Sequence, residues 1–256
     1  MARKISNHAF DSVELPIDGV LAIQTTRLHP LNVHQRNSQF GQYNLGMHVG
    51  DDIELVKANR QVLNRFFPAE AHIQWLEQVH GNDVAFIEQV NEQAIVADAA
   101  VTNKRNIALA VMTADCLPII LANKSGREVA VIHGGWKPLA KGIIQATLAN
   151  MNSKPCDIYA WLGPCIGRDN FEVGAEVRQI FMALDNNLTS AFTRVETSKS
   201  EKYLGNLPQI ASSLLTILGI TKIVDSNKCT VAMNERYYSY RKERNAGRMA
   251  TVVCLC

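Results

Sequence analysis

The feature of this sequence that most constrains its fold is a set of short runs made almost entirely of apolar residues. A run of this kind, bounded by turn residues, is typical of a β-strand buried in the protein interior. The strongest runs are residues 107–112, 118–121, 129–132, 158–162 and 249–255, and weaker strand patterns lie at 73–79, 84–90 and 220–224. The sequence therefore predicts a fold built around buried β-structure.

Helical patterns lie between these runs. From Ile53 to Leu63 apolar residues recur at helical spacing, with Asp51 placed to cap the helix and Pro68 placed to end it. Further helices are predicted at residues 138–150, 172–183 and 207–218. The polar segment 28–41 has no period, and we expect a long surface loop there. Because strands and helices are mixed without regular βαβ alternation, we expect a mixed-sheet α/β or α+β fold.

Composition and charge narrow the class of protein. Lys and Arg number 26 against 24 Asp and Glu, and a net charge of +2 is too weak to indicate a nucleic-acid or membrane partner. A hydrophobic content of 47% argues against intrinsic disorder. No linker rich in Gly, Pro or Ser divides the chain, so we expect a single domain over residues 1–256. We expect that domain to be a monomer or a weak homodimer.

Targeting signals are also missing from the sequence. The N-terminal region lacks the apolar core of a signal peptide. The most apolar stretch, residues 107–122, contains Thr113, Asp115 and Pro118 and is too short to span a bilayer. The six cysteines are widely spaced, which without a secretion signal indicates reduced thiols rather than a disulfide framework. We therefore expect a cytoplasmic protein.

Three strand-to-turn junctions carry side chains that can bind a metal ion. His80 lies in the first junction, Cys116 in the second and His133 in the third, each where an apolar run meets a turn. Two imidazoles and a thiolate suit zinc, and three protein ligands leave one coordination position open for chemistry. The three residues are much farther apart along the chain than the ligands of a zinc finger. The hypothesis of a metal site therefore requires the fold to bring three strand ends together.

Each of these residues also has a plainer interpretation. A histidine beside glycine is usually a turn residue, and a cysteine among apolar residues is usually part of the core. Taken singly, each residue favours the plainer interpretation by about two to one. Asp115, next to Cys116, strengthens the functional interpretation because a carboxylate in an apolar stretch is costly to bury unless it is paired or used. A turn-capping role for Asp115 is about equally consistent with the sequence.

Other familiar catalytic motifs are missing. The sequence has no P-loop for nucleotide phosphates, no dinucleotide-binding glycine fingerprint and no G-x-S-x-G nucleophile elbow. Zinc nucleobase deaminases carry H-x-E and P-C-x-x-C. Here Pro164 and Cys165 are followed by Ile166, Gly167 and Arg168, so the second half of that motif fails. If this protein deaminates a purine, it uses a different site.

Together with these junctions, a series of further motifs resembles one family over the chain from about residue 20 to the C-terminus. The family is that of the laccase-domain proteins, also called multicopper polyphenol oxidases and now regarded mainly as zinc-dependent purine nucleoside phosphorylases. The junction motifs are Gln78 to Gly81, Thr113 to Pro118 and His133 to Trp136. The others are Thr25-Thr26-Arg27, Asn44-Leu45-Gly46, His48-Val49-Gly50-Asp51-Asp52, Asn59-Arg60, Ala97-Asp98-Ala99, Gly163-Pro164-Cys165-Ile166-Gly167, Cys229-Thr230, Ser239-Tyr240-Arg241 and Gly247-Arg248-Met249.

The resemblance implies a layered α/β/β/α sandwich with mixed sheets. It implies a metal, Zn²⁺, held by His80, Cys116 and His133. The activities it implies are phosphorolysis of adenosine, inosine, guanosine and methylthioadenosine, with phosphate as co-substrate and ribose 1-phosphate as product. Deamination of adenosine is implied as a further activity.

Candidate residues for catalysis and substrate binding follow from the motifs. Asp115 joins the three metal ligands as a candidate acid/base or ligand-orienting group. The candidate substrate-binding residues are Asn44, Arg60, Gln78, Lys137 and Arg241. For a single Arg or Lys the solvated-surface interpretation is favoured by about three to one. For Arg60 and Arg241 only, the resemblance makes a binding role more nearly as favoured as the solvated-surface interpretation.

The chain departs from the family pattern in three places. Lys137 and Pro138 stand where the family usually has Arg-Gly, so the bidentate fork that suits phosphate and one backbone donor are lost. Residues 168–171 lack the further Cys and Tyr common in the family. Segment 28–41 does not match the family's Gly-rich stretch. If the family's arginine handles phosphate or substrate, we expect Lys137 to change the affinity for phosphate or the choice of substrate.

Three alternatives stay open at this point. Two histidines and a cysteine also bind copper in vitro, as a copper-dependent polyphenol oxidase requires, but seven histidines are too few for an added trinuclear cluster. Cys116 with His133 or His80 as base is a possible arrangement for a cysteine hydrolase. A zinc ion that only stabilises the fold would need a fourth ligand, for which His48 is the candidate.

Overall fold

Two stacked β-sheets form the centre of the molecule. The computed structural model describes residues 8–31, 39–196 and 200–256. The five-stranded sheet has the order β1 (Phe10–Ser12), β2 (Val20–Thr25), β16 (Met249–Leu255), β8 (Ile107–Thr113) and β3 (His72–Gln74). The six-stranded sheet has the order β15 (Lys222–Asp225), β11 (Ile158–Leu162), β9 (Leu117–Asn123), β10 (Val129–Gly134), β7 (Ala99–Thr102) and β5 (Val84–Phe86). Both sheets are mixed, because β3–β8, β11–β15 and β5–β7 pair in parallel and the other pairs are antiparallel.

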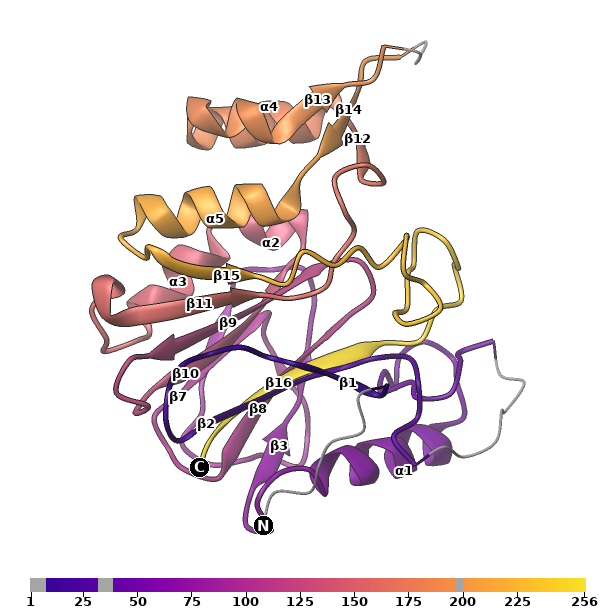
Figure 1. The fold of residues 1–256 in the computed structure, drawn as a ribbon, viewed down its shortest axis with the longest axis vertical. Coiled ribbons are helices and arrows are strands. Elements are labelled where there is room, and N and C mark those ends of the chain that lie inside the picture. Colours follow the sequence, from indigo (N-terminus) through magenta and orange to yellow (C-terminus); the bar gives the residue numbers. More distant parts are fainter. Residues whose placement is uncertain (1–7, 32–38, 197–199) are drawn as a thin grey trace.

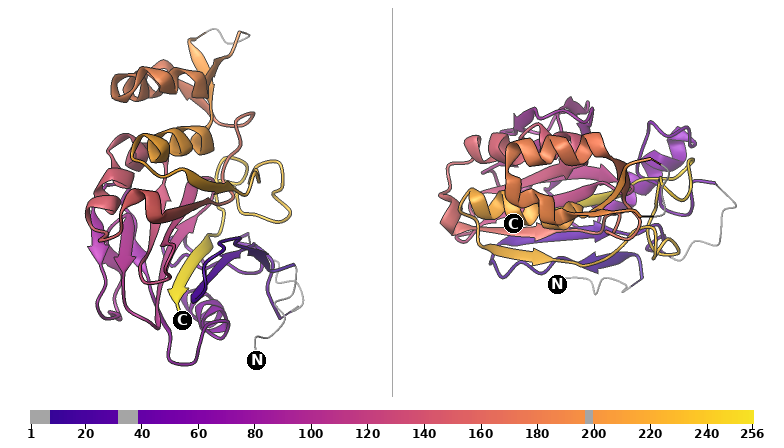
Figure 2. Two further views of the ribbon diagram at one scale, coloured as in Figure 1. Left: turned by 60° about the vertical axis from the view of Figure 1, so that its left-hand side comes forward. Right: turned by 90° about the horizontal axis from the view of Figure 1, so that it is seen from above.

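Helices cover the two outer faces of this pair of sheets (Figures 1 and 2). Helix α1 (Ile53–Asn64) covers the five-stranded sheet, and α2 (Trp136–Ala140), α3 (Ile143–Ala149) and α5 (Leu207–Ile217) cover the six-stranded sheet. Beyond α5 lies a further unit of α4 (Ala175–Leu184) and the three-stranded sheet of β12 (Glu172–Gly174), β14 (Lys202–Gly205) and β13 (Phe192–Arg194). The predicted α/β/β/α layering with mixed sheets is confirmed.

The apolar runs are continuous because both faces of the central strands are buried. In β8, Leu109 and Val111 pack between the two sheets, whereas Ala108 and Ala110 pack toward α1. In β9, Ile120 faces the other sheet and Ile119 faces the helices. A strand that is covered on one face alone would show alternating polar residues instead. The runs predicted at 158–162 and 249–255 coincide with β11 and β16.

Several predicted boundaries were wrong, for local reasons. The N-cap of α1 is Asp52, whose carboxylate accepts from the backbone N–H of Glu54 at 2.9 Å, whereas the neighbouring Asp51 accepts from the side chain of Asn44. The helix predicted at 138–150 is two helices, because Gly142 takes a left-handed conformation with φ of 82° between α2 and α3. The helix itself is broken at this residue because a regular helix needs negative φ.

Other differences concern short strands. The run 73–79 breaks at Trp75 into β3 and β4 (Leu76–Glu77), which pairs with β6 (Ile95–Val96), and the run 84–90 ends at Phe86. The helix predicted at 172–183 begins as β12 and becomes helical at Ala175. The sequence did not predict the short strands β1, β2, β6, β7 and β12 to β14, nor the 3₁₀ turns Pro155–Asp157 and Asn186–Ala191. Segments as short as these carry too few residues for a clear period.

Residues 28–41 were predicted to form a long surface loop. Residues 28–31 and 39–41 contain no helix or strand, and Phe40 is buried. The rest of the predicted loop, residues 32–38, lies outside the described residues.

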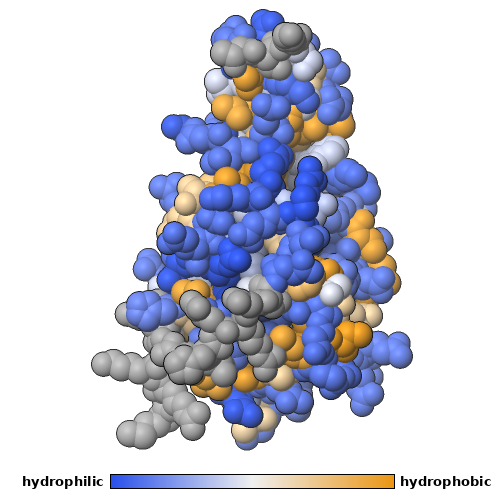
Figure 3. Space-filling view, turned by 90° about the vertical axis from the view of Figure 1, so that its right-hand side faces the viewer, coloured by the Kyte–Doolittle hydropathy of each residue, from blue (hydrophilic) through white to orange (hydrophobic). Residues whose placement is uncertain are grey.

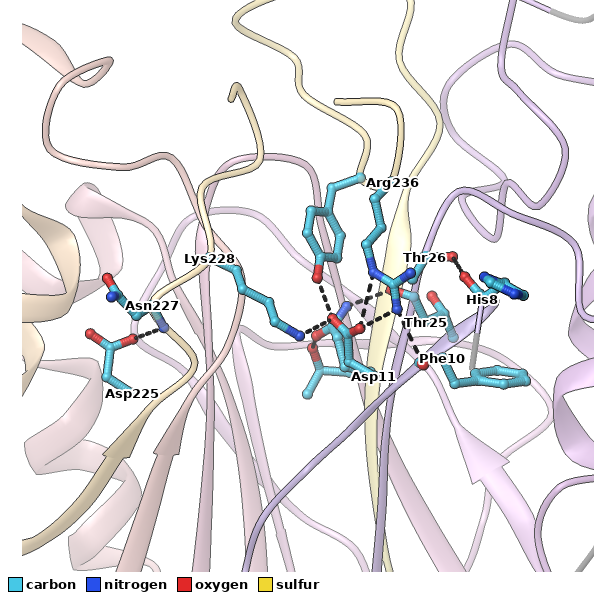
Figure 4. Close-up of polar contacts among 12 residues, drawn as sticks. His8, Phe10, Asp11, Thr25, Thr26, Asp225, Asn227, Lys228 and Arg236 are labelled. Carbon is cyan, nitrogen blue, oxygen red and sulfur yellow. Dashed lines mark hydrogen bonds and ion pairs between the residues drawn. The ribbon is translucent and has the colours of Figure 1, made fainter. Parts of the chain in front are cut away.

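Residues 226–248, here called the closing segment, connect β15 to β16 without a regular helix or strand (yellow at the right of Figure 1). Asp11 of β1, which is only 7% exposed, fixes this segment to the five-stranded sheet. Its carboxylate accepts from Nε of Arg236 at 3.1 Å, from Nζ of Lys228 at 3.0 Å and from the hydroxyl of Tyr237 (Figure 4). Three donors on one buried carboxylate give an irregular segment a definite position.

The surface is mainly polar. The face shown in Figure 3 is mostly hydrophilic, with hydrophobic side chains in separate patches. Among the described residues, no helix is long and apolar enough to cross a membrane. All six cysteines have free thiols. The apolar content of the sequence thus lies mainly in the three layers of core between the sheets and the helices.

Candidate metal centre

The three residues from the strand-to-turn junctions meet in the structure. One ligand atom of each of His80, Cys116 and His133 lies within 4.8 Å of those of the other two. Sγ of Cys116 is 3.9 Å from Nε2 of His80, and the two imidazole rings form an edge-to-face pair with centroids 4.7 Å apart. Among residues 8–31, 39–196 and 200–256, this is the one group of His, Cys, Asp or Glu side chains placed to hold a metal ion.

The six-stranded sheet brings Cys116 and His133 together. Strands β9 and β10 are antiparallel, with His133 opposite Pro118 and Gly134 opposite Leu117, so the start of β9 lies beside the end of β10. Cys116 is the residue just before β9. It follows Asp115, which has a φ of 90° in the tight turn from β8. A left-handed conformation is unfavourable for a side chain other than glycine, and such positions are common at functional sites.

Asp98, the residue just before β7, holds the backbone around His80 next to Cys116 and His133. The carboxylate of Asp98 is fully buried and accepts from three successive backbone N–H groups, those of Val79 at 3.1 Å, His80 at 3.0 Å and Gly81 at 2.6 Å. These bonds hold His80 in a left-handed conformation with φ of 58°. Asp98 therefore determines where the His80 ring lies.

Asp98 also orients His133. Its Oδ1 lies 2.7 Å from Nδ1 of His133, and its carbonyl accepts from the His133 backbone N–H at 2.8 Å. With Nδ1 donating to Asp98, Nε2 of His133 is left to bind a metal, as in carboxylate–histidine–metal arrangements. Asp98 was not among the site residues predicted from the sequence. A signal existed, because Asp98 is a carboxylate in an apolar stretch, as Asp115 is.

The electrostatics of the triad favour the thiolate that a metal needs. Burial alone would raise the pKa of Cys116, but the charge and hydrogen bonds of His133 and His80 lower it. Burial alone would lower the pKa of His133, but Cys116 and Asp98 raise it. The folded protein therefore stabilises a thiolate beside an imidazolium, and a divalent cation can take the place of the imidazolium proton.

Two cavities adjoin the triad. The first, of about 480 Å³, is here called the aromatic cavity, and it is bordered by His80 and Cys116. Its other walls are Val79, Ala114, Asp115, Trp136, Lys137, Lys141, Ile166, Phe171, Leu207, Tyr240 and Arg241. The second, of about 390 Å³, is here called the histidine cavity, and all three triad residues border it. Its other walls are His48, Gln78, Met112, Thr113, Ala114, Tyr240 and Arg248.

Asp115 and Arg241 join the closing segment to the triad. The Asp115 carboxylate accepts from the hydroxyl of Thr230 and from the backbone N–H of Arg241, both at 2.6 Å. The guanidinium of Arg241 donates to the carbonyls of Asn170 at 2.9 Å and Glu172 at 3.3 Å. Both residues border the aromatic cavity. The contacts of Asp115 fit an orienting role better than proton transfer, since both of its oxygens already accept hydrogen bonds.

Gln78 and Lys137 also lie at the cavities. The Gln78 amide is paired with the backbone of Met112, accepting from its N–H at 2.7 Å and donating to its carbonyl at 2.8 Å, at the wall of the histidine cavity. Nζ of Lys137 is 5.7 Å from the centroid of the Trp136 ring, at the wall of the aromatic cavity. The neighbouring Lys141, which was not predicted as a site residue, donates from Nζ to the carbonyl of His80 at 3.0 Å.

Asn44 and Arg60 border neither cavity. The buried Asn44 amide donates to Gly46 and Asp51 and accepts from the backbone N–H groups of Gly46 and Arg248, which uses its full hydrogen-bonding capacity. Arg60 lies with its guanidinium carbon 3.8 Å from the centroid of the Trp75 ring, and its Nε donates to the carbonyl of Leu45. The structure thus places both residues behind the site, where they support its walls.

Comparison with known proteins identifies the family of this chain. Residues 23–256 match the family described as multi-copper polyphenol oxidoreductase laccase. This chain belongs to that family. The resemblance inferred from the sequence motifs is confirmed.

Several relatives in this laccase family carry a functional name. A Shigella flexneri protein named purine nucleoside phosphorylase YfiH is 39% identical over 237 residues, which are 93% of this chain and 94% of the relative. A Haemophilus influenzae protein named purine nucleoside phosphorylase is 41% identical over 211 residues, 82% of this chain and 86% of the relative.

Solved structures share the laccase-family fold. A Neisseria meningitidis protein superposes with a TM-score of 0.89 at 32% identity, covering 96% of this chain and 99% of that one. YlmD of Geobacillus stearothermophilus superposes with a TM-score of 0.81 at 26% identity, covering 97% and 99%. The layers described above are therefore those of the family.

Proposed function

We propose that this chain is a zinc-dependent purine nucleoside phosphorylase. It converts adenosine, inosine, guanosine and methylthioadenosine, with phosphate, to the free base and the pentose 1-phosphate, and it deaminates adenosine as a further activity. The observation that carries the proposal is the geometry of His80, Cys116 and His133, three protein ligands at the wall of a cavity. Such a set leaves a coordination position for chemistry. The names of the relatives support the choice of reaction.

The donor set fits the metal. One soft thiolate and two borderline imidazoles suit Zn²⁺, and Asp98 supplies the outer carboxylate that fixes a metal-binding histidine. His48 borders the histidine cavity but does not belong to the close group, so the triad offers three ligands rather than the four of a structural zinc site. When bound, Zn²⁺ supplies a Lewis acid at the wall shared by the two cavities.

The residues of the aromatic cavity account for substrate binding. Breaking an N-glycosidic bond builds positive charge on the pentose and negative charge on the departing purine. Trp136, Phe171 and Tyr240 offer flat apolar surfaces for a purine, and such a wall also excludes water from the reacting bond. The ammonium groups of Lys137 and Lys141 border the same cavity and favour negative charge there.

Copper-dependent phenol oxidation is the competing function, because the same donor set binds copper. A multicopper oxidase needs a trinuclear cluster as well. The described part of the chain offers a single group of metal-binding side chains. We therefore favour phosphorolysis and treat phenol oxidation as an alternative outcome of the test.

The proposed enzyme acts on small molecules alone, as a cytoplasmic monomer or weak homodimer without a nucleic-acid or membrane partner. The net charge of +2 gives no electrostatic basis for binding a polyanion. Light scattering at several protein concentrations measures the oligomeric state.

The deciding experiment incubates the protein, prepared without added copper, with adenosine in the presence and absence of phosphate. Adenine formed only with phosphate indicates phosphorolysis, and inosine indicates deamination. Metal content and phenol oxidation are measured on the same sample. Cys116→Ala is expected to abolish zinc binding and adenine formation, whereas Cys156→Ala, at an exposed cysteine outside the triad, is expected to retain both. Full activity in a metal-free Cys116→Ala protein would discard the proposal.

A further inference from the structure

Arg248 is a half-buried cation whose guanidinium is held by backbone carbonyls, with the charges of Cys116, Tyr240 and Asp115 acting on it. Its Nη1 donates to the carbonyls of Ala246 at 2.7 Å and Gly247 at 3.1 Å. Among the described residues, no Asp or Glu forms an ion pair with it, although its side chain borders the histidine cavity. Burial lowers the pKa of Arg248, in keeping with a guanidinium that has lost part of its hydration. A cation in this situation is stabilised when an anion enters the cavity.

The position of Arg248 is built by a distant motif. Oδ1 of Asn44 accepts from the backbone N–H groups of both Gly46 and Arg248, each at 2.9 Å. A Cβ atom on Gly46 would come within 2.7 Å of Cγ of Arg248, so the stem of Arg248 fits only against a glycine. On another side, the guanidinium carbon lies 5.8 Å from the centroid of the Tyr240 ring. The Asn44–Gly46 motif therefore fixes the position of Arg248 at the wall of the histidine cavity.

The other walls of the histidine cavity suit an anion. The described residues that border it include no Asp or Glu. Burial, followed by the charges of Arg248 and Arg60, lowers the pKa of His48, so its imidazole is a neutral hydrogen-bonding group near neutral pH. Cys116 also borders this cavity, where its sulfur would be a ligand of the bound metal rather than a free anion beside the phosphate.

We propose that Arg248, with His48 beside it, forms an oxyanion subsite in the histidine cavity that takes the inorganic phosphate used in phosphorolysis. The inference rests on the proposed function and assigns its co-substrate to particular residues. The aromatic and histidine cavities share His80, Cys116, Ala114 and Tyr240 as walls, so a purine nucleoside in the first and phosphate in the second meet beside the triad. Because Nη1 is the guanidinium nitrogen that donates to Ala246 and Gly247, Nε and Nη2 remain available to bind a tetrahedral anion as a fork, which a lysine cannot reproduce.

Three variants test the subsite. Arg248→Met removes the charge and keeps most of the stem against Gly46, and Arg248→Lys keeps the charge without the fork. Arg168→Met is the matched control, because the Arg168 side chain is 75% exposed and borders neither cavity. For each zinc-loaded protein, phosphate affinity is measured by titrating inorganic phosphate under ³¹P NMR. The KM values for phosphate and for inosine, the zinc content and the melting temperature are measured alongside.

Arg248→Met is expected to weaken phosphate binding and raise the KM for phosphate by about tenfold to a hundredfold, the range for losing a hydrogen bond to a charged group. The KM for inosine and the zinc content are expected to stay within twofold of the unmodified protein. Arg248→Lys is expected to have a phosphate affinity between those of Arg248→Met and the unmodified protein. Arg168→Met is expected to have the phosphate affinity of the unmodified protein. If Arg248→Met fails to fold, the loss of phosphate affinity in Arg248→Lys decides the question.

Two results overturn the subsite. One is unchanged phosphate affinity in Arg248→Met and Arg248→Lys. If these variants also lose zinc while their phosphate affinity is unchanged, Arg248 supports the metal site instead. The other is no measurable phosphate binding by the unmodified protein. Failure of the proposed function looks different: phosphate binds and depends on Arg248, yet the unmodified protein releases no free base from any purine nucleoside.

Discussion

Asp98 and His133 form a buried carboxylate–imidazole pair, with Oδ1 and Nδ1 2.7 Å apart, and the same carboxylate holds the backbone turn that carries His80. One residue outside the triad thus places two of its three side chains. The third side chain of the triad, that of Cys116, is placed independently by the tight turn between β8 and β9. The triad is rigid because both supports are parts of buried sheet structure.

Asp98→Asn is expected to weaken zinc binding by about tenfold to a hundredfold, the usual effect of removing an outer carboxylate from a metal-binding histidine. The amide can accept at one atom only, so the turn at Val79 to Gly81 loses hydrogen bonds as well. Competition with a chromophoric chelator measures the zinc affinity. Asp83→Asn, at an exposed residue nearby, is the control, and equal affinities for the two variants would contradict the role given to Asp98.

Gly135→Ala tests the packing around the triad. A Cβ atom there would lie 3.1 Å from Sγ of Cys116 and 3.4 Å from Cδ2 of His80. We expect zinc affinity to fall about tenfold, comparable with the loss of an outer-shell partner. Gly142→Ala is the comparison, because its left-handed φ of 82° should cost about 1 kcal/mol of stability while zinc affinity is unchanged. Isothermal zinc titration and urea unfolding of both variants separate the two effects.

Thr230→Val tests the attachment of the closing segment. The variant removes the hydroxyl that donates to Asp115 at 2.6 Å but keeps the shape of a fully buried side chain. We expect the free energy of unfolding to fall by about 1–2 kcal/mol, since the bond is made to a charged group. Zinc content should be retained, because Thr230 contributes no ligand atom to the triad. A urea unfolding curve that superposes on that of the unmodified chain would show that this bond contributes nothing.

Asp11 gives a pH dependence of stability. Burial alone would raise the pKa of Asp11, but the hydrogen bonds from Tyr237, Arg236 and Lys228 lower it below its ordinary value of 3.8. A carboxylate with a lowered pKa in the folded state stabilises the fold above its unfolded pKa, and this contribution is lost as the pH falls through the folded pKa.

The measurement compares Asp11→Asn with the unmodified protein in urea unfolding between about pH 3 and pH 7. The variant is expected to be less stable at neutral pH, and the difference is expected to shrink as the solution is acidified below about pH 4. A difference that stays constant across this range would mean that the Asp11 charge does not stabilise the closing segment.

The sequence predicted the bounds of the fully buried strands more precisely than those of the short edge strands or of the broken helix. Strands β11 and β16 were found with their full bounds because burial on both faces leaves an uninterrupted apolar run that a local window detects. The helix at 138–150 was wrong as one unit because its apolar spacing continues through Gly142, where the backbone turns left-handed. Nothing in the spacing of the apolar residues marks that change of direction.

In the candidate site, too, residue types and strand ends were predictable from the sequence, whereas contacts between distant residues were not. His80, Cys116 and His133 were recognisable as candidates because each is a metal-binding residue type at the end of a strand. Asp98 and Arg248 were quoted in motifs but had no assigned role. Their roles depend on partners far away in the chain, such as the hydrogen bond from Arg248 to Asn44, and a local pattern does not encode them.

By itself, then, the sequence determined which segments are buried strands and which three side chains have metal-binding chemistry, since both follow from residue type and short-range period. Only the tertiary structure decided that Asn44 hydrogen-bonds the backbone of Arg248, that Asp98 holds two of the three triad side chains, and that two cavities meet beside Cys116. The physical reason is that strand register and the pairing of distant polar groups are set by the free energy of the whole packed chain. No short segment contains that information.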